Sequence, residues 1–314
     1  MKHTSKILIL KQTRIFFILL LGIFMTLSVS AIPAKRNVWK NLNLPDGTKV
    51  RAQLTGDEFG HYWLGKNGKS YAFNSNANFY QSINSAVLIS KAKECRQSAN
   101  ERSLRRLASH REGQVQGLRD SKKGLIILVN FADNTFERSH DNALYQRIAN
   151  EENFSYNKFR GSLYDYFKDQ SQGLFKLSFD VIGPVTLSKN LSYYGENDNN
   201  YLDKHSSQMI CEAVEQAKNL VSDWKQYDWN DDGKVDLTYV IYAGQGEEAG
   251  GEEYTIWSHS SSLSVAGASV TVGDNLIVDE YACSAELNSD KTINGIGHIC
   301  FAFPTLLDCP ISMT

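Results

Sequence analysis

The chain contains 314 residues, of which 42% are hydrophobic and 22% are charged. This is an ordinary globular composition, with enough residues for two modest domains. The formal net charge of −2 is too close to zero to indicate a nucleic-acid partner.

The N-terminus has the three parts of a secretory signal peptide. A basic segment, residues 1–14, precedes the apolar run Ile15–Leu27. Val29 and Ala31 then occupy positions −3 and −1 of a small-residue cleavage site. The apolar run is shorter than the roughly 20 residues that span a bilayer, which argues against a membrane anchor. We therefore expect cleavage after Ala31, no membrane span in the mature chain, and a secreted protein that is extracellular or periplasmic.

Residues 32–90 predict a small antiparallel sheet. Short runs of alternating polar and apolar residues are separated by turn pairs such as Asp46-Gly47, Thr55-Gly56 and Asn67-Gly68. Period-two alternation between Gly-containing turns is typical of hairpins.

Residues 91–123 carry ten Lys or Arg against four acids, with no strong apolar period. This pattern predicts a solvated basic linker with one short helix around Ser103–Leu107. The runs "RSLRR" and "SKK" also suit a trypsin-like protease, so the linker and a processing segment are compatible readings.

From Gly124 onward the pattern becomes that of a packed domain. Residues 124–133 predict a buried strand, and a short helix is expected within Gly161–Gly173. A strand ending at Gly183-Pro184 follows, then a helix over Asp203–Trp224 and a second buried strand over Val235–Gly244. This order predicts a mixed α/β domain, so the whole chain is assigned to the α+β class.

The segment "DWNDDGKVD" is a candidate calcium loop. Four side chains with oxygen donors recur at odd spacing: Asp228, Asn230, Asp232 and Asp236. Gly233 permits a sharp turn, and the Lys234 carbonyl could supply a further ligand. An EF-hand is excluded because Tyr239 stands where the bidentate Glu is needed. The simpler alternative is an Asx-rich turn between a helix and a strand.

A Gly-rich acidic segment, "AGQGEEAGGEEYTIWSHS", follows that strand. Such segments are usually solvated loops, although a second calcium site or a loop of a substrate cleft is possible. His259, beside an aromatic residue, is more typical of a hydrogen-bonded structural histidine than of a metal ligand.

No sequence-local catalytic motif is present. The seven histidines include no pair four residues apart, and therefore no His-Glu-x-x-His zinc helix. A nucleophile elbow, a phosphate loop and a dinucleotide fingerprint are also absent.

Several motifs in order resemble the immune inhibitor A family of secreted bacterial zinc metalloproteases. They are "LPDGTKVRAQLTGDEFGHYWLGKNGKSY", "KGLIILVNFADNTF", "GSLYDYFKDQSQGLFKLSFDVIGPVTL", "YYG", "DWNDDGKVDLTYVIYAGQGEEAGG", "IWSHS" and "NGIGHIC". The resemblance covers about Pro45 to Cys300. It implies a propeptide, a zincin-type catalytic domain, bound Ca²⁺ and Zn²⁺, and protein or peptide substrates.

In that family the Gly-Ile-Gly segment leads into His-Glu-x-x-His-x-x-Gly-x-x-Asp, whose histidines bind zinc and whose Glu activates water. Here Phe301, Ala302 and Thr305 occupy the positions of the first His, the Glu and the second His. Phe and Ala offer no ligand atom, and Thr is a poor zinc ligand. His298 lies three residues too early. No catalytic residue is therefore carried over.

The genetic code suggests a reason for this departure. Residues 303–314, back-translated and read one base out of frame, permit Ser-His-x-x-Gly-Leu-Pro-Asp-Phe-Tyr-Asp, the continuation that the family pattern requires. We hypothesise a single-base frameshift near codons 298–303. The alternative is a genuine, divergent C-terminus.

These inferences divide the chain into a signal peptide (1–31), a propeptide-like domain (32–90), a basic linker or processing segment (91–123), the N-terminal part of a truncated zincin-like catalytic domain (124–300) and an aberrant tail (301–314). The expected function is that of a secreted metalloendopeptidase homologue that is inactive as given. The alternative is a non-catalytic, calcium-stabilised secreted remnant or binding protein.

Overall fold

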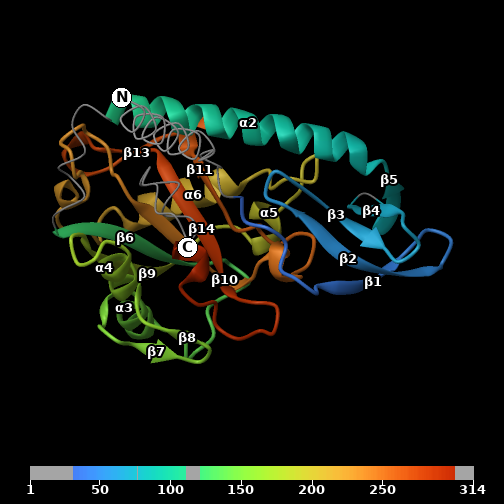
Figure 1. Ribbon diagram of the computed structural model, residues 1–314, viewed down its shortest axis with the longest axis horizontal. Helices are drawn as coiled ribbons and strands as arrows, with labels where there is room; N and C mark the ends of the chain where they lie inside the picture. Colours follow the sequence, from blue (N-terminus) through green and yellow to red (C-terminus); the bar gives the residue numbers. More distant parts are fainter. Residues whose placement is uncertain (1–30, 76, 111–120, 301–314) are drawn as a thin grey trace, which may run out of the picture.

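The computed structural model describes residues 31–75, 77–110 and 121–300 (Figure 1). The predicted signal peptide and the tail 301–314 therefore lie almost entirely outside the described residues. Two bodies of structure stand side by side in Figure 1: an antiparallel sheet from the first part of the chain, and a larger α/β layer structure from the rest.

The predicted antiparallel sheet is confirmed. Its five strands follow chain order: β1 (Trp39–Asn43), β2 (Lys49–Asp57), β3 (Gly60–Gly65), β4 (Ser70–Asn74) and β5 (Phe79–Ile83). The turn residues Gly47 and Gly68 adopt φ of 82° and 78°, which glycine takes without steric cost. The inward side chains of the sheet form one apolar cluster that also takes in Trp257 from the second body.

Residues 85–110 form one long helix, α2 (Ser85–His110). The expectation of only a short helix around Ser103–Leu107 is therefore wrong, while residues 111–120 of the predicted linker lie outside the described residues. The segment is rich in Ala, Lys, Glu, Gln and Arg, which favour helix without any apolar period. Only Ala92 is buried among its first residues, where α2 lies against β3. Since the other contacts of α2 in the described residues are polar, such as the Arg96–Asp57 ion pair, the sequence shows no amphipathic stripe.

The second body is built on a five-stranded sheet with the order β11-β14-β10-β6-β9. Its strands are β6 (Ser121–Asn130), β9 (Lys176–Thr186), β10 (Thr238–Gln245), β11 (His259–Ser262) and β14 (Glu280–Leu287). All neighbours pair in parallel except β11, which is an antiparallel edge. The run Leu125–Val129 of β6 is fully buried, as expected for a central parallel strand covered on both faces.

Helices cover both faces of this sheet. Helices α3 (Asn142–Asn150) and α4 (Leu163–Gln170) pack on one face, and α5 (Leu191–Tyr194) and α6 (Ser206–Ala217) on the other. Ser162 and Asp165 form a reciprocal capping box that fixes the start of α4. The remaining elements are short: β7 (Ser155–Tyr156), β8 (Phe159–Arg160), β12 (Val270–Thr271), β13 (Ile277–Val278), η2 (Lys225–Tyr227), η3 (Glu247–Ala249), η4 (Leu263–Ala266) and η5 (Gly273–Asn275).

The helix predicted over Asp203–Trp224 is shorter than expected. It ends at Ala217, and Leu220 is 57% exposed. The Trp224 indole donates a hydrogen bond to the Lys218 carbonyl at 3.1 Å, which satisfies a group left open at the helix end. Trp224 still reaches the predicted core, but through an irregular turn.

In the described part of the chain, no helix is both long and apolar enough to cross a membrane. The four described cysteines, Cys95, Cys211, Cys283 and Cys300, form no disulfide with one another.

The contact of α2 with β3 gives a first prediction. A Cβ on Gly60 would lie 2.9 Å from the Ala92 Cβ, so Gly60→Ala should force the helix away from the sheet. We expect a loss of about 1–3 kcal/mol in the free energy of unfolding, measured by urea denaturation. Adding Ala92→Gly removes the overlap and leaves only a helix-propensity cost of about 1 kcal/mol. An unchanged urea midpoint for Gly60→Ala would contradict this packing.

Candidate functional site

The candidate calcium residues lie in one loop between η2 and β10. Asp228 accepts hydrogen bonds from the Asp232 and Gly233 amides, both at 3.0 Å. Asn230 accepts from the Asp232 amide at 3.1 Å, and Asp236 accepts from the Trp229 amide. The predicted Asx-type turn is therefore present, with Gly233 at a φ of 84°.

The loop does not form a closed ligand cage. Within the described ranges, no three His, Cys, Asp or Glu side chains are grouped as ligands of one metal ion. Each carboxylate oxygen that accepts from a backbone amide nevertheless keeps a second lone pair. The oxygen donors are of the type that Ca²⁺ prefers, so the donor chemistry fits while the arrangement stays open.

Asp236 is the acid of this loop whose pKa is shifted. Burial, with smaller effects of the nearby Asp232 and Asp228 carboxylates, raises the pKa of its carboxyl group to about 7. The hydrogen bond from the Trp229 amide opposes this rise, and the Lys122 side chain opposes it less. A carboxyl group held beside two other acids is a position where a cation would relieve repulsion.

The segment after β14 approaches the place where the family's zinc helix would begin. The Asn294 amide nitrogen donates to the Glu286 carbonyl at 2.6 Å, and its side chain donates to the Ala285 carbonyl at 3.1 Å. The backbone then turns helical from Gly297 to Cys300, where the described residues end. Phe301, Ala302 and Thr305 lie outside the described residues.

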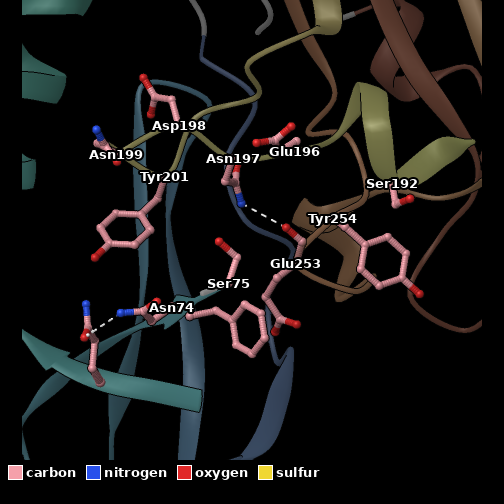
Figure 2. A pocket seen from close by; sticks show the side chains of 12 residues that line it. Asn74, Ser75, Ser192, Glu196, Asn197, Asp198, Asn199, Tyr201, Glu253 and Tyr254 are labelled. Carbon is pink, nitrogen blue, oxygen red and sulfur yellow. Dashed lines mark hydrogen bonds between the residues drawn. The ribbon is translucent and has the colours of Figure 1, made fainter. Parts of the chain in front are cut away.

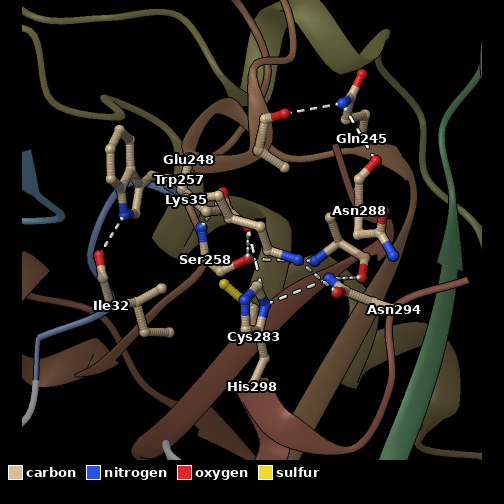
Figure 3. A network of polar contacts seen from close by, with 12 residues as sticks. Ile32, Lys35, Gln245, Glu248, Trp257, Ser258, Cys283, Asn288, Asn294 and His298 are labelled. Carbon is tan, nitrogen blue, oxygen red and sulfur yellow. Dashed lines mark hydrogen bonds and ion pairs between the residues drawn. The ribbon is translucent and has the colours of Figure 1, made fainter. Parts of the chain in front are cut away.

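A polar network surrounds this helix start (Figure 3). The Lys35 ammonium donates to Asn294 Oδ1 at 3.1 Å, and the Lys35 amide donates to the Glu248 carbonyl at 2.8 Å. His298 Nδ1 lies 3.3 Å from the Asn294 side chain and 3.8 Å from Glu248 Oε1. Burial, with a smaller effect of Lys35, lowers the pKa of His298 to about 4. His298 is therefore a neutral, structural histidine in this network.

The expectation of a solvated acidic loop is wrong for Glu247 and Glu248, which are buried. They are 5% and 0% exposed, in the short helix η3. The Glu248 carboxylate accepts hydrogen bonds from the Ser258 hydroxyl at 2.7 Å and from the Ser258 amide at 3.1 Å. Burial raises the pKa of Glu248, and those hydrogen bonds oppose the shift. Of the second acidic pair, Glu252 is exposed and Glu253 is half-buried, and Lys40 bridges the two.

The same loop anchors the N-terminal sheet. Trp257 is 2% exposed, and its ring stacks on His61 of β3 with centroids 4.2 Å apart. His61 Nε2 lies 3.3 Å from Glu247 Oε1. His259, by contrast, accepts or donates within its own body, to the Trp257 carbonyl and the Tyr281 hydroxyl. It is a hydrogen-bonded structural histidine, as expected.

A polar pocket of about 360 Å³ opens on another side of the contact between the two bodies (Figure 2). The antiparallel sheet and its following turn contribute Phe73, Asn74, Ser75 and Gln81, and the second body contributes Ser192, residues 196–199, Tyr201, Glu253 and Tyr254. Since both bodies supply its walls, this pocket exists only while they are docked.

Sequence reasoning missed Lys35, His61 and Glu248 as parts of one site. Lys35 and Glu248 are separated by more than 200 residues, so no local spacing links them. One sequence signal could have indicated that this loop is buried. The large apolar side chain of Trp257 lies close to the acidic residues, and such a side chain is usually covered by other parts of the protein.

His61 gives a pH prediction. Burial lowers the pKa of His61, but the Glu247 carboxylate, with a smaller effect of Asp57, raises it more, so the net shift is upward from 6.5. A raised pKa contributes stability that is complete below the unfolded value and is lost as the pH rises through the folded value.

We therefore expect the free energy of unfolding to fall by about 1 kcal/mol more in the native chain than in His61→Gln between about pH 6 and about pH 8. Urea denaturation at both pH values measures this difference. Equal pH dependence in the two proteins would show that the imidazolium form of His61 does not stabilise the docked sheet.

Two comparisons with known proteins match the part of the chain that forms the second body. The family described as immune inhibitor A peptidase M6, catalytic domain, matches residues 111–296, which contain β6 through β14. The pre-pro-metalloprotease PrtV of Vibrio cholerae serotype O1, strains M66-2 and ATCC 39315, is 28% identical over 189 residues. That alignment covers 47% of this chain and about a fifth (20%) of PrtV. With more than half of its length matched, the chain belongs to the immune inhibitor A peptidase family.

Proposed function

We propose that the chain is a precursor-type member of this family, in which residues 32–90 act as a propeptide domain on the first part of a secreted metalloendopeptidase catalytic domain. The family match over residues 111–296 carries this proposal. The docking of Lys35, His61 and β3 onto the loop 244–258 supports a propeptide role. It places the N-terminal domain beside the start of the helix at Gly297.

We propose further that this chain does not hydrolyse peptide bonds. Zinc, when bound in the family, polarises the substrate carbonyl and activates water. The residues here do not fit that group, because Phe301 and Ala302 have no ligand atom and Thr305 is a poor ligand. The single described histidine near this position, His298, is neutral and held by Asn294.

Metal content and proteolysis test this proposal together. We expect the purified chain to bind less than about 0.1 zinc per molecule, measured by atomic emission after dialysis, and to leave unfolded casein intact. An active relative of the family serves as the positive control. One tightly bound zinc per chain together with chelator-sensitive hydrolysis of casein would refute it, and would support a protein-degrading enzyme with a different ligand set.

A second part of the proposal concerns calcium. We propose that the loop of Asp228, Asn230, Asp232 and Asp236 binds Ca²⁺, supported by the oxygen donors and by the raised pKa of Asp236. The ion would fix the entry of β10, the strand from which the loop 244–258 continues.

Calcium should therefore stabilise the chain against unfolding. At a concentration about 100 times its Kd, Ca²⁺ adds about 2.7 kcal/mol to the free energy of unfolding. Asp228→Asn with Asp232→Asn should abolish this increment in a thermal or urea titration. Asp231→Asn is the matched control, because Asp231 lies in the same loop with a side chain that is 78% exposed. Equal Ca²⁺ stabilisation of all three proteins would exclude the loop as the site.

A further inference from the structure

The backbone at Ile32 is buried where the two bodies meet. Ile32 is 3% exposed, and its carbonyl accepts a hydrogen bond from the Trp257 indole at 2.9 Å (Figure 3). Its nitrogen donates to Glu58 Oε2. The next residues continue along the end of β2, since Pro33 bridges Asp57 and the Ala34 amide donates to the Gly56 carbonyl at 2.9 Å.

The Glu58 carboxyl group at this position has one oxygen without a hydrogen-bond partner among the described residues. Its Oε1 is inaccessible to solvent and has no hydrogen-bond partner in the part of the chain that the structure describes. The Arg96 guanidinium pairs with the neighbouring Asp57 instead. Burial, with a smaller effect of the Asp57 carboxylate, raises the pKa of Glu58 to about 8, although the hydrogen bond from the Ile32 amide opposes this rise. An inaccessible carboxylate oxygen without a donor or a cation is costly, so Oε1 lacks the partner that Oε2 has.

We propose that Glu58 is the binding site for the α-ammonium group of Ile32, formed when a signal peptidase hydrolyses the Ala31–Ile32 bond. Water adds across this amide bond. Residues 1–31 leave with the new Ala31 carboxylate, and the Ile32 amine takes up a proton. The proposal rests on the predicted signal peptide and on no peptidase activity of the chain itself.

Cleavage gives the Ile32 nitrogen the positive charge and the additional N–H groups that the Glu58 carboxylate lacks. An amide nitrogen has one N–H to donate, and Oε2 already accepts it. An ammonium group has three donors and a positive charge. It can therefore donate to both carboxylate oxygens, and an opposite charge within about 4 Å favours the ionised carboxylate. Since Trp257 holds the Ile32 carbonyl, the pair would also fix the N-terminus on the second body.

Amine acylation tests the pocket apart from the position of cleavage. Two chains are made from a cleavable fusion, one beginning at Ile32 and one at Ala31, and each is treated with a limiting acylating reagent near neutral pH. Mass spectrometry of the N-terminal peptide gives the rate relative to the exposed Lys49. We expect the Ile32 amine to react at least about tenfold more slowly than the Ala31 amine, since each unit of raised pKa reduces the neutral amine tenfold.

Glu58→Gln in the chain that begins at Ile32 should restore fast acylation, whereas Glu101→Gln, on the exposed face of α2, should not. Denaturation in urea should equalise all the rates. Equal native rates for the Ile32 and Ala31 amines would overturn the proposal even if Glu58→Gln fails to fold. Mass spectrometry of the exported chain checks the processing step separately, and an N-terminus other than Ile32 would also overturn it.

Discussion

The burial of Trp257 in the core of the antiparallel sheet is the contact on which the arrangement of the two bodies depends. Its ring belongs to the same apolar cluster as Leu42, Leu54 and Trp63, although it comes from the loop after β10. An indole of this size contributes about 2–3 kcal/mol through burial alone. The stacked His61 ring and the hydrogen bond to the Ile32 carbonyl set its orientation. The N-terminal sheet is therefore packed against the second body through a shared core, not joined only by a tether.

This shared core concentrates acidic groups in a dry contact. Asp203 accepts from the Trp257 amide at 2.9 Å, and its Oδ1 has no hydrogen-bond partner among the described residues. Burial raises the pKa of Asp203 well above its usual value, and the Glu247 carboxylate adds to that rise. Two basic residues that face these acids come from the N-terminal part of the chain: Lys35, which attracts Glu248, and His61, which lies 3.3 Å from Glu247. Docking thus depends on charge balance as well as on apolar area.

The secondary structure was predictable where a single local rule decided it. The continuous apolar run predicted the buried strand β6, and the apolar spacing within Gly161–Gly173 predicted the short helix α4. Helix α2 was not predictable from periodicity, because Ala92 alone among its early residues is buried. The candidate calcium residues could be placed in one loop, but the sequence could not show whether their oxygens face one another or the backbone amides.

The contacts of the buried Glu247 and Glu248 escape sequence reasoning because their partners lie far away in the chain. These contacts also bear on the proposed propeptide role of residues 32–90. Removal of residues 32–90 would take the stacked His61 ring away from Trp257 and would leave Glu247 without the facing His61. Both changes are unfavourable, the first through lost apolar burial and the second through uncompensated charge. The loop 244–258 would then be driven to rearrange. Glu248 of this loop lies 3.8 Å from His298, so we expect a rearrangement of the loop on release of the proposed propeptide to reach the helix that starts at Gly297.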